Sequence, residues 1–372
     1  MKFTVKKSDV SEVLSKVQGI TSRKTGMDIT KNVLIQSVDS GIKIMATDLE
    51  TNFEGVYPAN IESEGMILIN GKKLSEIVKD FPDQDILINE LDKYWIEIGN
   101  KTNVEYRIAG INPEDFPELP DINEVEFFEI HSTALKSMIE KALIINIWDD
   151  MRDYIIGVFF QKTDAKDNQT IRMVSTDAGR LLTIDHFYEK NVKLPDIPDV
   201  LIPKKGLNEV NKFIDNKEVV RIGIKDDYFV LKKEVETITI RLLEEDFPEY
   251  KDIIKRDEDN LAVLDKNKFQ MMLKRMSILS SERYKGAVFS FSKDKLVISS
   301  ANPDIGESKE DLAVEFKGKP VKAFYNIKFF TEILGAIEED KVVLNIIDQE
   351  KPCLIQGQDN DNFLSLIMPM KM

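Results

Sequence analysis

Short amphipathic segments recur along this chain at intervals of about sixty residues. In each segment, apolar residues follow the spacing i, i+3, i+4, i+7, which is typical of a helix with one buried face. The sequence therefore predicts six helices, whose apolar stripes begin at Val10, Leu74, Leu135, Leu207, Phe269 and Phe330. Because similar helices return at similar spacings, we expect the chain to be built from repeated units.

Residues near the expected helix starts support this reading. Asp9 precedes Glu12 by three residues, which predicts a capping box at the start of the first helix. We expect Ser132 to cap the third helix and either Asp265 or Asn267 to cap the fifth.

Between the predicted helices, polar and apolar residues alternate or apolar residues run in short bursts, as in GIKIMATD, YWIEIGN and KVVLNIID. This pattern is typical of strands. IKDDY and SKDKL place turn residues between two such runs, which predicts hairpins. Each unit is thus one helix with several mostly antiparallel strands, and the predicted fold class is α+β.

The pentapeptide EDFPE occurs twice, at residues 114–118 and 245–249, each time after a predicted strand. Proline ends a strand because it lacks the N–H that the ladder needs, and the carboxylates keep the linker solvated. Each copy therefore marks a boundary between two domains. The sequence predicts three similar domains of two units each, at residues 1–122, 123–253 and 254–372.

The composition fits a multidomain cytoplasmic protein. The chain has 372 residues, too many for one ordinary core, and 42% of them are hydrophobic. Its apolar runs are too short for a membrane helix, and the N-terminal MKFTVKKSDV has no secretory apolar region. Cys353 is the only cysteine, so an intrachain disulfide is impossible and a reducing compartment is expected.

Few residues are suited to catalysis or to metal binding. His131 and His186 are the only histidines, and with Cys353 they cannot form a zinc cluster. Capping or surface placement is the simpler role for both. The Gly-Lys pair at Lys72 lacks the upstream glycine of a phosphate-binding loop. We therefore expect neither an enzyme nor a bound cofactor or metal.

Charge is unevenly distributed along the chain. The net charge is −15, yet the predicted helices hold more basic than acidic residues. One interpretation is that lysine is simply a good helix former on a solvated face. The other is that one basic surface binds a polyanion while the acidic remainder repels it.

A series of short phrases runs in one order from Met1 to Met372: MKFTV, ATDLE, DFPEL, STDAGRLL, IPKKGL, DFPEY, SSERYKG, ANPDIGES and MPMKM. Together they resemble the bacterial sliding clamp, the beta subunit of DNA polymerase III. The resemblance implies three alike domains per chain and a head-to-tail dimeric ring, with helices lining the hole and sheets outside. It implies a processivity factor that encircles duplex DNA and tethers the replicative DNA polymerase and repair proteins.

The same resemblance implies the partners and the DNA-binding residues. Expected partners are duplex DNA, the clamp loader, the polymerase, other proteins with a clamp-binding motif and a second copy of the chain, but no membrane. Helices across the hole would contact phosphates without reading bases, so the ring could slide. The candidate DNA-binding residues are Lys24, Lys72, Lys73, Arg152, Lys204 and Lys205. The loop around Lys24, RKTGMDIT, departs from the family, which has a proline-containing phrase there.

The resemblance also implies a pocket that takes a short linear peptide. Methionines and branched side chains would form adaptable apolar walls there. The residues carried over are Ile155, Thr176, Gly179, Arg180, Leu181, Pro248, Ile253, Phe329, Met368, Pro369, Met370 and Met372. The chain departs from the family at Ala178-Gly179, where Gly-His is usual, at Lys371-Met372, where Arg-Leu is usual, and at Asp252, where a basic residue is frequent.

The dimer interface would join the first domain of one chain to the third domain of the other. The resemblance assigns its apolar part to Tyr106, Ile278 and Leu279, and its acidic part to Asp304, Glu307, Glu310 and Asp311. Two other classes of protein remain open. A peptide-binding scaffold that does not encircle DNA would keep peptide binding and lose DNA-dependent effects. An enzyme is disfavoured because no nucleophile-base pair is evident.

Overall fold

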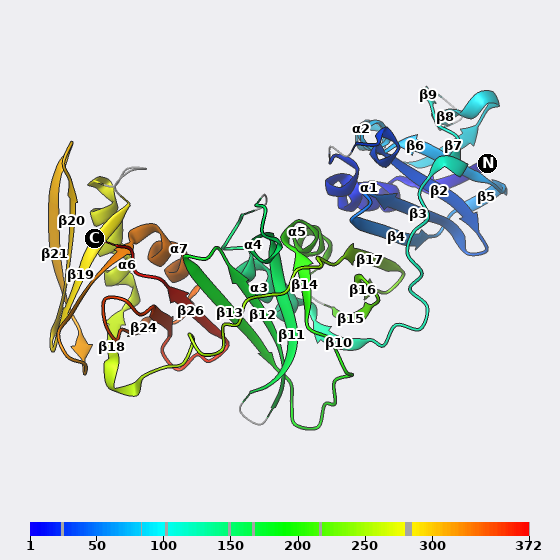
Figure 1. The fold of residues 1–372 in the computed structure, drawn as a ribbon. Coiled ribbons are helices and arrows are strands. Elements are labelled where there is room, and N and C mark those ends of the chain that lie inside the picture. The colour runs from blue at the N-terminus through cyan, green and yellow to red at the C-terminus, as the bar shows by residue number, and fades with distance from the viewer. Residues whose placement is uncertain are drawn as a thin grey trace. The chain divides into compact units, whose positions relative to one another are not determined.

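Residues 1–23, 26–82, 84–100, 103–147, 150–165, 168–215, 218–279 and 285–371 are described by a computed structural model (Figure 1). They form two compact units. The first unit comprises Met1–Lys136 with Lys205–Leu243, and the second comprises Ser137–Lys204 with Glu244–Met372.

The six predicted helices are all present among the described residues. They are α1 (Lys7–Thr21), α2 (Gly71–Asp80), α3 (Ser132–Ala142), α5 (Lys204–Phe213), α6 (Lys266–Met276) and α7 (Ile327–Ala336). The sequence did not predict the one-turn helix α4 (Asp153–Ile156). Short 3-10 turns are η1 (Asp28–Lys31), η2 (Asp92–Tyr94), η3 (Pro113–Asp115), η4 (Glu258–Asn260) and η5 (Ser277–Leu279).

The first unit contains two antiparallel sheets. The five-stranded sheet has the order β5 (Asn60–Ser63), β1 (Lys2–Lys6), β7 (Asp85–Glu90), β8 (Trp95–Gly99), β9 (Glu105–Ala109). The eight-stranded sheet has the order β10 (Phe128–His131), β15 (Val219–Lys225), β16 (Tyr228–Lys233), β17 (Glu236–Arg241), β4 (Thr51–Tyr57), β3 (Gly41–Thr47), β2 (Asn32–Val38), β6 (Met66–Asn70).

The second unit repeats this plan. Its nine-stranded sheet has the order β14 (Val200–Pro203), β11 (Gly157–Ala165), β12 (Asn168–Thr176), β13 (Arg180–Phe187), β26 (Phe363–Ile367), β25 (Cys353–Gly357), β24 (Lys341–Asn345), β18 (Leu261–Asp265), β22 (Glu315–Phe316). Its four-stranded sheet has the order β21 (Gly306–Ala313), β20 (Lys295–Asn302), β19 (Gly286–Ser292), β23 (Val321–Asn326).

The large sheet of each unit joins strands that are distant in sequence. In the first unit β4 pairs with β17, with Asn52 opposite Thr239, and the Asn52 side chain donates to Thr239 Oγ1 over 2.9 Å. In the second unit β13 pairs with β26, with Leu182 opposite Ser365. β4 and β13 are each the third strand after the first helix of a repeat, and β17 and β26 each end a repeat. The same strand pairing is therefore made twice.

Among the strands that the structure describes, two sheet edges of the same kind remain open. β21 is the third strand after α6, and it forms one edge of the four-stranded sheet. β9 ends the first repeat, and it forms one edge of the five-stranded sheet. By position in the repeat, β21 corresponds to β4 and β13, while β9 corresponds to β17 and β26.

The two EDFPE copies lie against sheet faces. Phe116 packs on Leu34, Met45 and Leu68, which are cross-strand neighbours on one face of the eight-stranded sheet. Phe247 stacks on Phe159 of β11 with ring centroids 4.9 Å apart. The repeated phenylalanine therefore holds the connecting segment against a sheet. The sequence had predicted only that the proline ends the strand.

The two hairpin predictions are confirmed, since Lys225 pairs with Tyr228 and Ser292 with Lys295. The capping box at Asp9 is wrong. Helix α1 begins at Lys7, so Asp9 lies inside its first turn, and no side-chain hydrogen bond caps this end.

The cap of α6 is Asp265 and not Asn267. The Asp265 carboxylate accepts a hydrogen bond from the backbone N–H of Lys268 over 2.8 Å. Replacing Asp265 with alanine should lower the free energy of unfolding by about 1 kcal/mol. Asn267 lies within the first turn of the helix, so Asn267→Ala should cause no loss, because alanine is the better helix former. Hydrogen exchange of the α6 amides would measure both, and equal effects of the two variants would contradict this cap.

Candidate functional site

The predicted peptide-binding residues that the structure describes all lie in the second unit, and several of them are in contact. The backbone N–H of Met368 donates to Gly179 O over 2.9 Å. The Phe329 ring covers Gly179 so closely that an added Cβ would lie 3.2 Å from it. Ile253, Met368 and Met370 are 46%, 38% and 40% exposed. They give this region an apolar surface open to solvent. Met372 lies outside the described residues.

The turn between β12 and β13 positions Gly179 and Arg180. The Asp177 carboxylate accepts hydrogen bonds from the N–H groups of Gly179 and Arg180 over 3.0 and 2.9 Å. Thr176 Oγ1 accepts from Ala178 N–H over 3.1 Å and donates to Arg180 O over 2.7 Å. Ala178 has φ +68°, a left-handed conformation that favours glycine. A glycine would adopt this conformation more readily than the alanine present here.

The ATDLE phrase of the first repeat forms the same turn. Thr47 Oγ1 accepts from Leu49 N–H over 2.9 Å, and Asp48 accepts from Glu50 N–H over 3.1 Å. Leu49 has φ +77°. The matching phrases in the sequence therefore encode one turn built twice from Thr and Asp side chains.

Arg180 is part of the scaffold of this region. Its side chain is buried, pairs with Asp177 over 2.9 Å and with Glu332 of α7, and lies over the Phe329 ring at 4.4 Å. Because both carboxylates already occupy the guanidinium, Arg180 holds α7 against the β12–β13 turn. Three other residues predicted to bind the peptide, Ile155, Thr176 and Leu181, are also buried.

Lys204 corrects a prediction from the sequence. Its side chain is fully buried, and its ammonium group donates to the backbone carbonyl of Ile155. The pKa of Lys204 falls from 10.5 to about 8, because removal from water lowers it, the negative charge of Asp177 opposes the shift, and the positive charge of Arg180 adds to it. The prediction that Lys204 contacts DNA is wrong, because its charged group points into the protein and donates to the carbonyl of Ile155.

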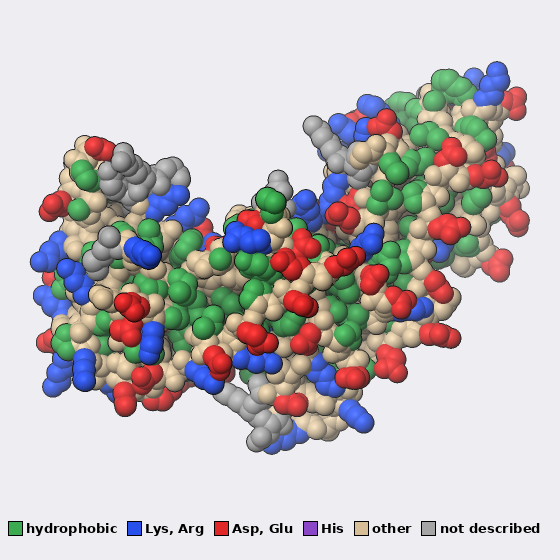
Figure 2. Space-filling view, viewed as in Figure 1, with side chains coloured by type: hydrophobic (Ala, Val, Ile, Leu, Met, Phe, Trp, Pro, Cys, Tyr) green, Lys and Arg blue, Asp and Glu red, His purple; other side chains and the backbone are tan. Residues whose placement is uncertain are grey.

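The four remaining candidate DNA-binding residues that the structure describes are exposed. Lys72 and Lys73 lie in the first turn of α2, where Lys73 pairs with Glu76 over 2.8 Å. Lys205 follows Lys204 in α5 and points to solvent. Arg152 pairs with Asp150 over 2.9 Å. Lys24 lies outside the described residues. On the face shown in Figure 2, acidic side chains are scattered among basic ones.

The three residues assigned to the dimer interface flank the open sheet edges. Tyr106 lies on β9 and is 40% exposed. Ile278 is 73% exposed in η5, and the carbonyl of its neighbour Leu279 accepts from the Asn302 side chain over 2.9 Å. Of the predicted acids, Glu310 pairs with Arg275 of the same chain. Part of the acidic set is therefore neutralised within the chain.

Other site chemistry is limited. Among the residues that the structure describes, no group of His, Cys, Asp and Glu is suited to hold a metal ion. Within the same residues, no helix is long and apolar enough to cross a membrane.

Comparison with known proteins accounts for the whole chain. Models of the DNA polymerase III beta subunit match residues 1–120 (N-terminal domain), 129–249 (central domain) and 251–371 (C-terminal domain). The beta sliding clamp of Pseudomonas aeruginosa is 26% identical over 377 residues, and that of Chlamydia pneumoniae is 25% identical over 372 residues. The match covers all of this chain in both cases, with 100% and 99% of those proteins.

Solved structures show the same fold. The DNA polymerase III beta subunit of Pseudomonas aeruginosa superimposes with a TM-score of 0.92 at 24% identity, and the Bacillus subtilis sliding clamp with 0.91 at 24%. These matches cover 100% of this chain, with 100% and 99% of those chains. The fold is therefore the three-domain clamp fold of the α+β class.

The chain belongs to the DNA polymerase III beta subunit family, the bacterial sliding clamps, and has the function of a DNA sliding clamp. The family supplies a non-catalytic processivity factor of DNA replication. The resemblance, fold class and general function predicted from the sequence are confirmed.

The buried charge of Lys204 has a consequence that can be measured. Below about pH 8, Lys204 is charged in both the folded and the unfolded chain, so its burial lowers stability fully. As the pH rises from about 8 to 10.5, the folded chain loses this proton while the unfolded chain keeps it, and stability rises. The free energy of unfolding of the wild type should therefore increase relative to that of Lys204→Met over this range.

Denaturant unfolding at a series of pH values tests this expectation. Lys205→Met is the matched control, because it removes an exposed lysine from the next position of the same helix. A difference between wild type and Lys204→Met that stays constant from pH 8 to 10.5 would contradict the buried, proton-releasing state.

Proposed function

We propose that two copies of this chain close head to tail into a ring that encircles duplex DNA and tethers DNA-processing proteins. The supporting observation is the repeated strand pairing, β4 with β17 and β13 with β26. The corresponding strands β21 and β9 have no such partner within the chain, since each forms a sheet edge among the described strands. Pairing β21 of one copy with β9 of the other would repeat the same junction and cover both edges.

The proposed domains are residues 1–122, 123–253 and 254–372. The two internal strand pairings then join the first domain to the second and the second to the third. The pairing between copies joins the third domain to the first. Tyr106, Ile278 and Leu279 would form the apolar part of this last junction.

The dimer can be tested by placing charge at that junction. Ile278→Asp with Leu279→Asp should give a folded monomer, because burying two carboxylates at an apolar contact costs several kcal/mol. Analytical ultracentrifugation would show about 42.7 kDa in place of twice that mass. Val235→Asp is the control, because Val235 is 57% exposed in the β16–β17 turn and should remain dimeric. A double variant that still sediments as a dimer would place the interface elsewhere.

The proposed DNA contacts are Lys72, Lys73, Lys205 and Arg152, with Lys24 as a further candidate. Support comes from position in the repeat. Lys72, Lys205 and Lys328 all occupy the second residue of the last helix in their repeats, and all three are exposed. Three equivalent cations would meet phosphates in the same manner, without reading base sequence. Lys328 joins the candidates on this ground.

Encirclement predicts how the protein leaves DNA. Once placed on nicked circular DNA by a clamp loader and ATP, it should remain bound at a salt concentration that abolishes direct binding, because escape requires ring opening or a DNA end. Cutting the circle should release it. Lys72→Glu with Lys205→Glu should reduce loading while leaving the dimer intact, and Lys190→Glu on the loop after β13 is the control.

Gel filtration of labelled protein on circular and linearised DNA measures this difference. Equal loss from both at high salt would contradict the ring and favour the alternative, a peptide-binding scaffold that does not encircle DNA.

The tethering site is proposed at the apolar surface of the second unit. Leu181, Pro248, Ile253, Phe329, Met368, Pro369 and Met370 would form its walls, with Ile155, Thr176, Gly179 and Arg180 supporting them. The ligand would be a short peptide with a glutamine followed by a leucine and an aromatic residue. We propose that the clamp loader, the replicative polymerase and repair proteins carry such peptides, and that this chain itself catalyses no reaction.

A further inference from the structure

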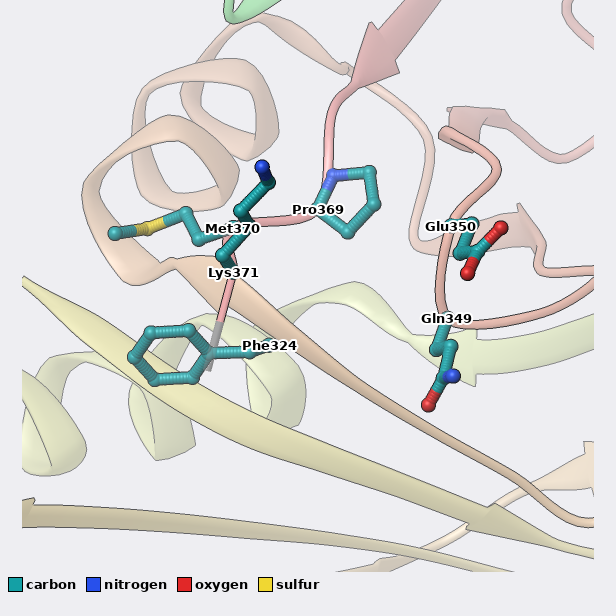
Figure 3. Close-up of a pocket in the computed structure, with 6 residues that line it drawn as sticks. All are labelled: Phe324, Gln349, Glu350, Pro369, Met370 and Lys371. Atoms are coloured by element: carbon teal, nitrogen blue, oxygen red, sulfur yellow. The ribbon is translucent and has the colours of Figure 1, made fainter.

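A pocket of about 450 Å³ lies beside the C-terminal segment in the second unit. Figure 3 shows the six residues that line it: Phe324, Gln349, Glu350, Pro369, Met370 and Lys371. Pro369 and Met370 also belong to the proposed peptide site, so the pocket continues that site. Gln349 and Glu350 come from a turn that the sequence analysis did not single out.

Both sides of this pocket are held by backbone hydrogen bonds. Met370 N–H donates to Phe324 O over 2.7 Å, which fixes the C-terminal segment beside β23. On the other side, the Asp348 carboxylate accepts from the N–H groups of Glu350 and Lys351, each over 2.8 Å. These two hydrogen bonds lower the pKa of Asp348, so the turn is stabilised by a carboxylate that stays ionised at neutral pH. The turn therefore holds Gln349 and Glu350 at the pocket.

The pocket carries opposite charges on its two sides. In Figure 3, Gln349 and Glu350 lie across the pocket from Met370 and Lys371. Glu350 and Lys371 are both exposed, and within the described part of the chain neither forms an ion pair. A ligand can therefore bind either charge without breaking an existing pair. In the same view, the Phe324 ring and Met370 lie on the Lys371 side, and Pro369 lies between that side and Glu350 (Figure 3).

We propose that this pocket binds an arginine side chain of the partner peptide, with the carboxylate of Glu350 as its anchor. The proposal rests on the peptide-binding function proposed above and names a further determinant of its specificity. Arginine suits the pocket in three ways. Its guanidinium can pair with a carboxylate through two hydrogen bonds, its apolar stem can pack on Pro369, and a remaining N–H can reach the Gln349 side-chain carbonyl oxygen.

Lys371 should affect the binding of arginine in the opposite direction to Glu350. Its ammonium group repels a cation in the same pocket, so it should weaken arginine binding and keep the guanidinium at the Glu350 side. Removing Glu350 and removing Lys371 should therefore change the affinity for an arginine peptide in opposite directions. A pocket that merely excluded water would not show this reversal.

The test uses fluorescent peptides that contain the glutamine, leucine and aromatic residue. One series places arginine in turn at each of the positions flanking this motif, and the matched series places glutamine there. Anisotropy gives the dissociation constants for the full-length wild type, Glu350→Gln, Lys371→Gln and Met368→Ala. On the wild type, one arginine position should bind about threefold more tightly than its glutamine match, the size typical of an exposed ion pair.

Glu350→Gln should abolish this advantage, Lys371→Gln should enlarge it, and added salt should reduce it. Glu350→Asp, which keeps the charge, should retain part of it. Met368→Ala should weaken both peptides equally, because it removes apolar contact and leaves the charges unchanged.

The outcomes separate the two proposals. If Met368→Ala weakens binding but no arginine position gains affinity on the wild type, the Glu350 proposal is overturned and the peptide site stands. An arginine advantage that persists in Glu350→Gln also overturns it. If the wild type binds neither series, the peptide site itself is contradicted, and the role of Glu350 is contradicted with it.

Discussion

The pairing of a strand from one repeat with the last strand of the next repeat, made twice in this chain, is the constraint on which the rest of the structure depends. β4 with β17 and β13 with β26 turn what would be exposed edges into the interiors of large sheets. Each pairing also brings a helix of one repeat close to the Thr-Asp turn of the other. The apolar surface at Met368 exists because β26 ends where β13 begins, with Met368 N–H bonded to Gly179 O.

Similar charge clusters accompany the two junctions. In the first, Arg23 contacts Asp48 and Glu209, and in the second, Arg180 contacts Asp177 and Glu332. The acids occupy equivalent positions, on the turn and in the facing helix. The arginine does not, since Arg23 follows α1 while Arg180 begins β13. The two junctions thus share the positions of their carboxylates, but the arginine that pairs with them comes from a different element in each.

The sequence predicted the features that follow from the spacing of apolar residues. It did not predict features that depend on one contact between residues distant in the chain. The helices and hairpins follow from apolar spacing, and the three domains follow from the repeated units. The burial of Lys204 does not, because a lysine in a Lys-Lys pair has the pattern of a solvated helix face. Alignment of the repeats contains the missing signal, since Gly71 and Ile327, at the same helix position, are also buried. For the pocket beside Glu350, alignment of the repeats gives no such signal, because the two sides of the pocket are distant in sequence and meet only after folding.

The two junctions differ in the residue at one helix position. At the third position of the helix, the first junction has Gly206 and the second has Phe329. Gly206 lies so close to Ile240 that a Cβ would come within 2.5 Å of it, so that junction is filled by its own strand. Phe329 instead lies over Gly179 and Arg180, and the chain continues past β26 into Met368, Pro369 and Met370, which are all partly exposed. One architecture therefore yields a closed contact in the first case and an adaptable apolar surface in the second. Equivalent junctions of one polypeptide can thus differ in the apolar surface that they expose, because the identity of a few residues decides whether the space between repeats is filled from within.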